Sequence, residues 1–195
     1  MVNGNLAYEF DSEPEQREEL LDGKPVLLAT PSANHHFVAE NIWVLFRDFL
    51  RGKTCRAITD GMRVYLTDKD RFIPNVMIVC DRKKIRPDGI HGAPDLMVEV
   101  LSPATARMDR GRKMQIYGRS GVREYWIVDL KSKSVEQYLL RDGELRFHNA
   151  YTVFEDWEFA DLTPEERERT ETAVRCDIFP GLELPLDDIF HDLID

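Results

Sequence analysis

The amino-acid sequence predicts an α/β protein whose mixed β-sheet is flanked by helices and extended by β-hairpins. Three observations support this fold class. Short apolar runs bounded by Pro or Gly at 74–80, 94–103 and 124–129 are typical of buried strands. A segment with apolar residues at helical spacing precedes them along the chain. A second predicted helix, 105–120, joins two of the strands as in a βαβ crossover, so we expect that pair to be parallel.

Size and composition predict one globular domain spanning residues 1–195, with a charged insertion at about 155–176. The chain is 43% hydrophobic and 32% charged, which is ordinary for a protein with a substantial core. Its formal net charge of −10 provides no overall attraction for nucleic acid, so contact with DNA requires a local basic patch.

Location is predicted from what the sequence lacks. No run approaches the ~18 apolar residues of a membrane span, and the first residues have no signal-peptide pattern. Cys55, Cys80 and Cys176 are widely separated, without zinc-ligand spacing or disulfide density. We therefore expect a reduced, cytoplasmic protein with no membrane contact, in which Cys80 is a small core residue.

The first third of the chain predicts a helix, a strand and a longer helix. Residues 12–23 begin with a capping Ser, carry Pro in the first turn and end at Gly, which predicts a short acidic helix. Residues 26–29 predict a brief strand. Ser32 or Asn34 can cap the longer helix, which runs to about Arg51. Its apolar stripe consists of Val38, Ile42, Leu45, Phe46 and Phe49.

Two Asp-Gly pairs indicate hairpins, one within residues 55–66 and one within residues 135–148. The strand at 74–80 is apolar on both faces, so we expect it near the centre of the sheet. Residues 81–92 are interpreted as a polar loop. The charged insertion contains a predicted solvated helix that begins near Thr163.

The last residues predict an edge strand or loop at 179–186, followed by a short helix that ends near Leu193.

Glu99 is the most informative residue, because it interrupts the apolar strand 96–101. A buried carboxylate needs a cation, a metal ion or a proton as its partner. Asn75 begins the neighbouring strand, and Lys113 lies in the helix that follows Glu99. A carboxylate and a polar side chain that hold a metal ion beside a lysine are suited to metal-assisted hydrolysis of a phosphodiester. The alternative is an ion pair between Glu99 and Lys113 or Arg112.

The run from Gly92 to Ala106, with Asp109, Lys113, Tyr117 and the segment 121–129, resembles the Uma2 family of restriction-endonuclease-like proteins. The resemblance covers about 20–190. It implies a branch of the PD-(D/E)XK nuclease superfamily, whose core is a mixed sheet flanked by helices. It also implies a Mg²⁺-dependent endonuclease that hydrolyses DNA.

Carried over residue by residue, the resemblance places Asn75 at the Asp position of the motif and Glu99 at its acidic position. Leu101 stands where the superfamily has Lys, and the resemblance implies that Lys113 has taken that role. It implies Mg²⁺ or Mn²⁺ on Asn75, Glu99 and the Val100 carbonyl.

The resemblance does not decide which other acidic or polar groups join the site. Glu40 and Asn41 are alternatives for a supplementary group on the first helix.

Asn75 departs from the family pattern, because an amide brings no charge to a metal site. The alternatives are a weakened or dead natural site, an engineered inactive form, or recruitment of another acid such as Asp81 or Asp95. Structural turn capping is the competing interpretation of Asp95. Asp109 is expected to pair with Lys113 or Arg112.

Tyr117 is expected in the core. A basic stretch follows the Glu99 strand and is either a local DNA contact or a solvated helix face. It comprises Arg107, Arg110, Arg112, Lys113 and Arg119.

Two further hypotheses belong to other functional classes. A non-catalytic DNA-binding or protein-interaction module would keep the fold without cleaving DNA. A homodimeric scaffold would use apolar edge segments such as 135–140, and a homodimer is the expected assembly.

Overall fold

The computed structural model describes residues 17–59, 61–154 and 156–194. Its centre is a six-stranded mixed sheet, as predicted. β9 and β10 pair in parallel in the middle of the sheet, and the other neighbouring strands pair antiparallel. In spatial order the strands are β12 (Glu144–Thr152), β11 (Ser134–Arg141), β10 (Glu124–Asp129), β9 (Leu96–Val100), β6 (Val76–Val79) and β3 (Arg56–Thr59).

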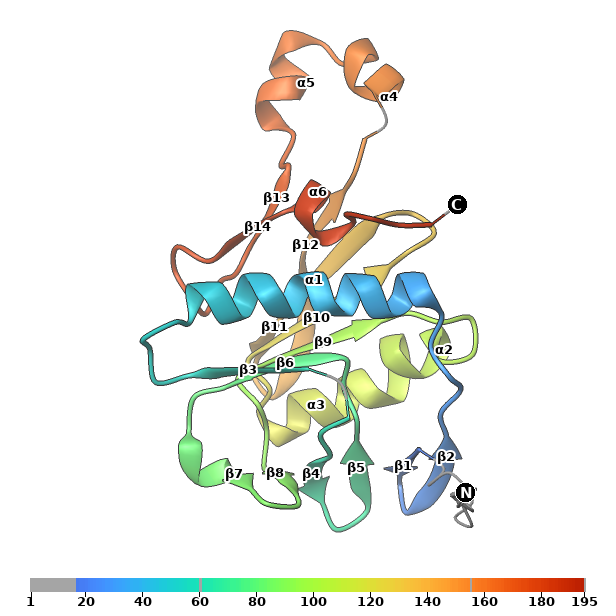
Figure 1. The fold of residues 1–195 in the computed structure, drawn as a ribbon, viewed down its shortest axis with the longest axis vertical. Coiled ribbons are helices and arrows are strands. Elements are labelled where there is room, and N and C mark those ends of the chain that lie inside the picture. The colour runs from blue at the N-terminus through green and yellow to red at the C-terminus, as the bar shows by residue number, and fades with distance from the viewer. Residues whose placement is uncertain (1–16, 60, 155, 195) are drawn as a thin grey trace, which may run out of the picture.

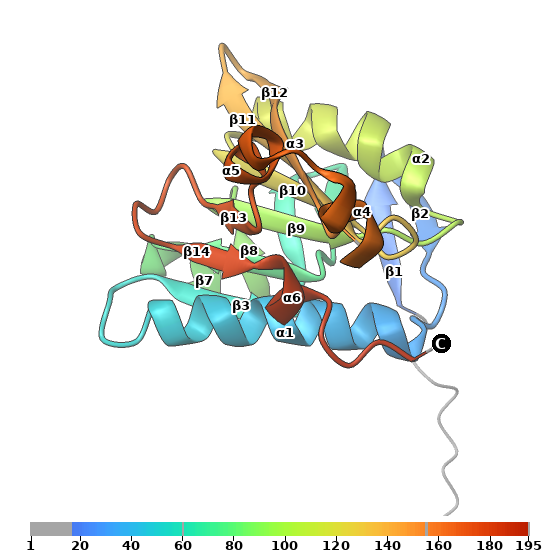
Figure 2. The ribbon, with the colours of Figure 1, turned by 90° about the horizontal axis from the view of Figure 1, so that it is seen from above.

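Helices cover both faces of this sheet, which explains why its middle strands are buried almost throughout and mostly apolar. Helix α1 (Ala33–Phe49) lies across one face, and the helical segment between β9 and β10 lies on the other (Figure 2). Ser32 caps α1 by accepting a hydrogen bond from the His35 N–H, as predicted. Alternation along β9 directs Val98 toward the α1 core, whereas Met97 joins the opposite core.

A second six-stranded sheet lies below the central one in Figure 1. Its last two strands lie in the segment 81–92, which is therefore partly regular structure rather than the predicted loop. A short 3-10 turn, η1 (Arg82–Lys84), precedes them. In spatial order the strands are β2 (Lys24–Leu27), β1 (Glu18–Leu21), β5 (Asp70–Phe72), β4 (Val64–Thr67), β8 (Gly89–His91) and β7 (Ile85–Arg86).

The predicted helix over residues 12–23 is wrong from residue 18 onward, where the chain forms the β1–β2 hairpin. Residues 12–16 lie outside the described residues. Asp22 and Gly23 have φ values of 52° and 78°. Positive φ at both central residues is characteristic of a tight hairpin turn, and Asp-Gly is its usual sequence. The acidic, helix-favouring composition of the segment concealed that turn signal.

The predicted hairpin over residues 55–66 is also wrong. β3 pairs with β6 in the central sheet, whereas β4 pairs with β5 and β8 in the second sheet. The chain thus changes sheets near Gly61 instead of turning back on itself. Hairpin signals are local, but burial of the apolar side chains of both strands depends on partners from elsewhere in the sequence.

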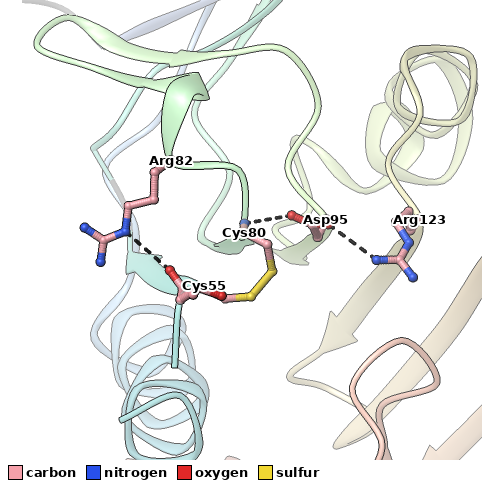
Figure 3. Close-up of a disulfide and its surroundings, with 6 residues drawn as sticks. Cys55, Cys80, Arg82, Asp95 and Arg123 are labelled. Atoms are coloured by element: carbon pink, nitrogen blue, oxygen red, sulfur yellow. Dashed lines mark hydrogen bonds and ion pairs between the residues drawn. A yellow bond between two sulfur atoms is a disulfide. The ribbon is translucent and has the colours of Figure 1, made fainter. Parts of the chain in front are cut away.

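Cys55 and Cys80 form a disulfide across the ends of β3 and β6 (Figure 3). The prediction that the cysteines are reduced is therefore wrong for this pair, and Cys80 is not simply a core residue. The pairing of Arg56 with Val79 places the two cysteines at the next opposed position, with Cα atoms 3.9 Å apart. Their separation of 25 residues gave no sequence signal for this contact.

The predicted hairpin over residues 135–148 is confirmed as β11 and β12, joined at Asp142 and Gly143. β11 lies between β10 and β12, so segment 135–140 is not a sheet edge and does not offer the dimer contact expected of it. The edge strand on this side is β12.

The charged insertion forms α4 (Asp156–Asp161) and α5 (Pro164–Arg169), which stand away from the body (Figure 1). The chain returns through β13 (Ala173–Arg175), β14 (Glu183–Pro185) and the short α6 (Leu186–Ile189). Within the described residues, no helix is long and apolar enough to cross a membrane.

Buried Glu124 anchors the returning segment to the central sheet. Its Oε1 accepts hydrogen bonds from Trp126 Nε1 and Gln137 Nε2, each at 2.6 Å. Its Oε2 accepts from the Ile178 N–H at 3.0 Å and from Cys176 Sγ at 3.3 Å. Four donors thus satisfy this carboxylate, which gives it a structural role.

Candidate active site

The predicted site residues meet at the floor of a cavity of about 620 Å³. Glu19, Asn75, Glu99 and Lys113 all line it and are almost completely buried. They come from both sheets and from the helical segment after β9, so the cavity forms where these three parts of the fold meet. Asn75, Glu99 and Lys113, singled out from the sequence, are therefore brought together.

The helix predicted over 105–120 is present but interrupted. It consists of α2 (Ala106–Met108), a π-helical turn η2 (Asp109–Lys113) and α3 (Met114–Ser120), and it ends at Gly121 with φ 94° as expected. A π turn widens the helix by one residue and is frequent at functional sites. Here both ends of the turn, Asp109 and Lys113, are buried with their side chains paired.

Lys113 holds three carboxylates at once. Its Nζ lies 2.9 Å from Glu19 Oε2, 3.2 Å from Glu99 Oε1 and 3.1 Å from Asp109 Oδ1. The contact between Lys113 and Asp109 is an ion pair without a hydrogen bond. Among the described residues, no donor is aligned to hydrogen-bond the buried Asp109 Oδ1. The expected pairings of Lys113 with Glu99 and with Asp109 are both confirmed, and Arg112 instead binds Asp22.

Burial raises the pKa of Glu99 to about 8, because the charged carboxylate loses water and has two other carboxylates nearby. Lys113 lowers it, as does the hydrogen bond that Tyr117 Oη donates to Glu99 Oε1 at 2.7 Å. Burial also opposes the charge on Lys113, but the three carboxylates outweigh this and raise the lysine pKa. Tyr117 is in the core, as predicted, and it also orients Glu99.

The Asn75 side chain is fixed by the neighbouring strand. Its Oδ1 accepts a hydrogen bond of 2.8 Å from the Val100 N–H, so the remaining side-chain atom is an amide nitrogen. An aspartate in this position would have a second carboxylate oxygen there. The amide therefore brings no charge to a cation, and its single oxygen already accepts this hydrogen bond with one of its two lone pairs.

The Val100 carbonyl, expected as a metal ligand, has a partner that the sequence did not reveal. His35 Nε2 lies 2.9 Å from Val100 O, which places a ring nitrogen of α1 at the edge of the site. His35 also lines the cavity.

Neither of the alternatives on α1 reaches the site. The Glu40 side chain is exposed, and Asn41 donates to the backbone of Ile189 and His191. His35, one turn earlier, is the α1 residue that lines the cavity. The sequence showed that polar side chains lie near the start of α1. It did not show which turn of the helix faces the sheet.

The two acids considered as replacements for the missing Asp have structural roles. Asp81 is exposed and caps η1 through a hydrogen bond from Lys83 N–H. Asp95 Oδ2 accepts from the Cys80 N–H at 2.8 Å, and its Oδ1 lies 3.5 Å from Arg123 (Figure 3). Asp95 is therefore structural, but it holds the end of the neighbouring strand and Arg123 and does not cap its own turn.

Glu19 is the site residue that sequence reasoning missed. It comes from β1, is 1% exposed, and accepts hydrogen bonds from the Ile73 N–H and from Lys113. The available signal was the Asp-Gly turn that follows it. Recognising that turn would have placed Glu19 on a strand with one buried face.

The raised pKa of Glu99 predicts a pH dependence of stability. Because the folded protein holds this proton more tightly than the unfolded chain, unfolding releases it between the ordinary pKa of 4.5 and about 8. Stability from this group is therefore full below the lower value and falls as pH rises to the upper one. Urea unfolding in EDTA, measured across this range, should show the decline.

Glu99→Gln is the control for this pH dependence, because the amide mimics the protonated acid. The variant should lose the decline and be more stable than the wild type above pH 8. Parallel curves for the two proteins would contradict the assignment.

The charge of the site fits a divalent cation. Three buried carboxylates face one ammonium group, so the cluster carries an excess of negative charge that a cation would balance. Within the described ranges no three His, Cys, Asp or Glu side chains are arranged to hold a metal ion. The expected ligand set does not require three side chains of these types. It comprises the Glu99 carboxylate, the Asn75 amide and the Val100 backbone carbonyl.

A mixed sheet with helices on both faces, and an acidic strand residue beside a lysine at a cavity floor, is the arrangement expected of a restriction-endonuclease-like fold. A family model described as "Putative restriction endonuclease", named Uma2, matches residues 5–187. The chain belongs to the Uma2 family.

A solved structure and two curated proteins are similar to this chain. The structure, from Anabaena variabilis ATCC 29413, is described as a "putative nuclease belonging to DUF820". It has a TM-score of 0.67 and 17% identity, covering 92% of each chain, which shows the shared fold. Two uncharacterized Synechocystis proteins, slr1290 and sll1609, are each 25% identical to this chain. The alignments cover 69% and 63% of this chain and 72% of each relative.

Proposed function

We propose that this protein is a Mg²⁺-dependent endonuclease acting on DNA phosphodiester bonds, with a site weakened by Asn75. One observation carries the proposal. Glu99, Glu19 and Lys113 meet at the floor of a cavity with more carboxylates than ammonium groups. Membership of a family described as "Putative restriction endonuclease" agrees with this chemistry.

The residues have distinct proposed roles. Glu99, Asn75 and the Val100 carbonyl would hold the metal ion, with Glu19 as a further acid. When bound, Mg²⁺ or Mn²⁺ supplies an activated water and neutralises charge on the phosphate. Lys113 orients the attacking water and stabilises negative charge, and Tyr117 holds Glu99 in place.

Basic side chains in the cavity lining support a polyanionic substrate. Arg17, Arg110 and Lys131 line the cavity in an otherwise acidic protein. The predicted basic stretch is less available than its composition suggests. Arg110 pairs with Glu136 at 2.7 Å, and Arg112 pairs with Asp22.

Two measurements on the wild-type protein test the proposal. Isothermal titration should show Mn²⁺ binding, and supercoiled plasmid should be nicked slowly with Mn²⁺ but not with EDTA. Glu99→Gln should remove both signals, because it takes away the carboxylate that lies between Asn75 and the Val100 carbonyl in the proposed ligand set, and Glu19 alone would not replace it. Nicking that persists in Glu99→Gln would identify a contaminant or another site.

A second function is favoured by the engagement of Asn75 Oδ1 and Val100 O in hydrogen bonds. On that view the protein is a non-catalytic DNA-binding module that keeps the fold. DNA binding would then be salt-sensitive and would survive Glu99→Gln without any metal uptake. The homodimer and the cytoplasmic location remain predictions, and sedimentation tests the first.

A further inference from the structure

We infer that the cavity takes a single-stranded or locally unpaired DNA segment rather than an intact duplex. The inference rests on the proposed function, because it names the form of the substrate of that same site. The carboxylates lie at the floor, where Glu99 is 4% exposed and Lys113 is 3% exposed. A phosphodiester must therefore enter the cavity to reach them.

The size of the cavity favours one strand over two. Its volume of about 620 Å³ is that of a pocket for a single small ligand, within the usual range of roughly 300–1,000 Å³. A duplex is a stiff rod with a persistence length of about 50 nm. A single strand lacks this stiffness, so it can bend to bring a backbone phosphate to the floor of such a pocket.

The walls suit an unpaired nucleotide. Leu28 and Pro31 contribute from the β2–α1 connection, Pro103 and Ala104 from the loop after β9, and Leu130 from the end of β10. In a duplex, stacking on neighbouring bases covers the apolar faces of a base. In an unpaired nucleotide these faces are exposed, and the apolar walls of the cavity can contact them.

Cations accompany these walls, so the pocket combines apolar contact with charge for a phosphate backbone. Lys131 lines the cavity and has an exposed side chain, whereas the Arg110 guanidinium is held by Glu136 and Asp129.

Fluorescence anisotropy in EDTA tests this inference without any cleavage. The probe is a short fluorescein-labelled DNA strand, alone or annealed to its complement. We expect the single strand to bind about tenfold more tightly than the duplex. Equal or tighter binding of the duplex would overturn the inference.

Two variants connect this preference to the cavity. Ala104→Trp should fill the pocket and remove the preference for the single strand, whereas Ala104→Ser should keep it. Lys131→Ala should reduce the slope of log affinity against log salt by about 0.7. Lys83→Ala is the matched control, because Lys83 is exposed and does not line the cavity. Retention of the full preference in Ala104→Trp would contradict the inference.

Cleavage and metal binding separate this inference from the proposed function. If Mn²⁺ binds and intact duplex is cut as fast as gapped duplex, the nuclease proposal stands and the single-strand inference fails. If the single strand is preferred but no metal binds and nothing is cut, the inference stands and the nuclease proposal fails.

Discussion

Asn75→Asp is expected to strengthen Mn²⁺ and Mg²⁺ binding by on the order of tenfold to a hundredfold and to raise plasmid cleavage accordingly. One carboxylate oxygen would keep the hydrogen bond from the Val100 N–H that Asn75 Oδ1 accepts now. The other would replace the amide nitrogen with a charged oxygen beside Glu99. A second charge on the ligand set is the largest single gain available to a site for a hard cation.

The same change should destabilise the metal-free protein. It adds a carboxylate to a buried cluster in which Lys113 already faces three. Urea unfolding in EDTA should therefore show a lower midpoint than the wild type, and Mn²⁺ should raise it again by mass action.

Gln115→Glu is the matched control for the Asn75 variant. It also converts an amide to an acid, but on the exposed side of α3 beside Arg112. Titration and plasmid cleavage should be unchanged in this control. An Asn75→Asp protein that folds but binds metal no better than the wild type would remove Asn75 from the ligand set.

Lys113→Met is expected to reduce the free energy of unfolding by about 3–5 kcal/mol. Lys113 is 3% exposed, and its removal leaves Glu19, Glu99 and Asp109 without their common cation. Met occupies similar space, so the change isolates the charge. Acidification should recover part of the loss, because protonating a carboxylate relieves the repulsion.

Urea unfolding measures this effect, with Lys83→Met as the control because that side chain is exposed. The double variant Lys113→Met with Glu99→Gln should be more stable than the sum of the two single changes predicts. Additive effects would show that the two groups are not coupled, contrary to the 3.2 Å contact between them.

Several features of this protein were predictable because they depend on local pattern. The strands around Glu99 and Trp126 are apolar on both faces, and such runs are buried wherever they occur. The helix from Ser32 and the Asp142–Gly143 turn follow from capping and turn chemistry. Glu99 was identified because a carboxylate in an apolar strand requires a partner.

The failed predictions share a physical cause. The segment before Gly23 has the composition of a helix, but it forms a hairpin of the second sheet. The chain near Gly61 has the signal of a hairpin, but its two strands are divided between the central sheet and the second sheet. Strand pairing is decided by burial against partners distant in sequence, which local propensity does not record. The disulfide between Cys55 and Cys80 depends on the same long-range register.

The sequence by itself determined the central strands, the crossover helix and the identities of Glu99, Asn75 and Lys113, because periodicity and residue type are local properties. Only the tertiary structure decided that Glu19, 94 residues before Lys113, completes the acidic cluster and that Asn75 turns its oxygen to Val100. The reason is that the charge balance of a buried site is a sum over all groups within contact distance. That set exists only once both sheets and the interrupted helix have packed together.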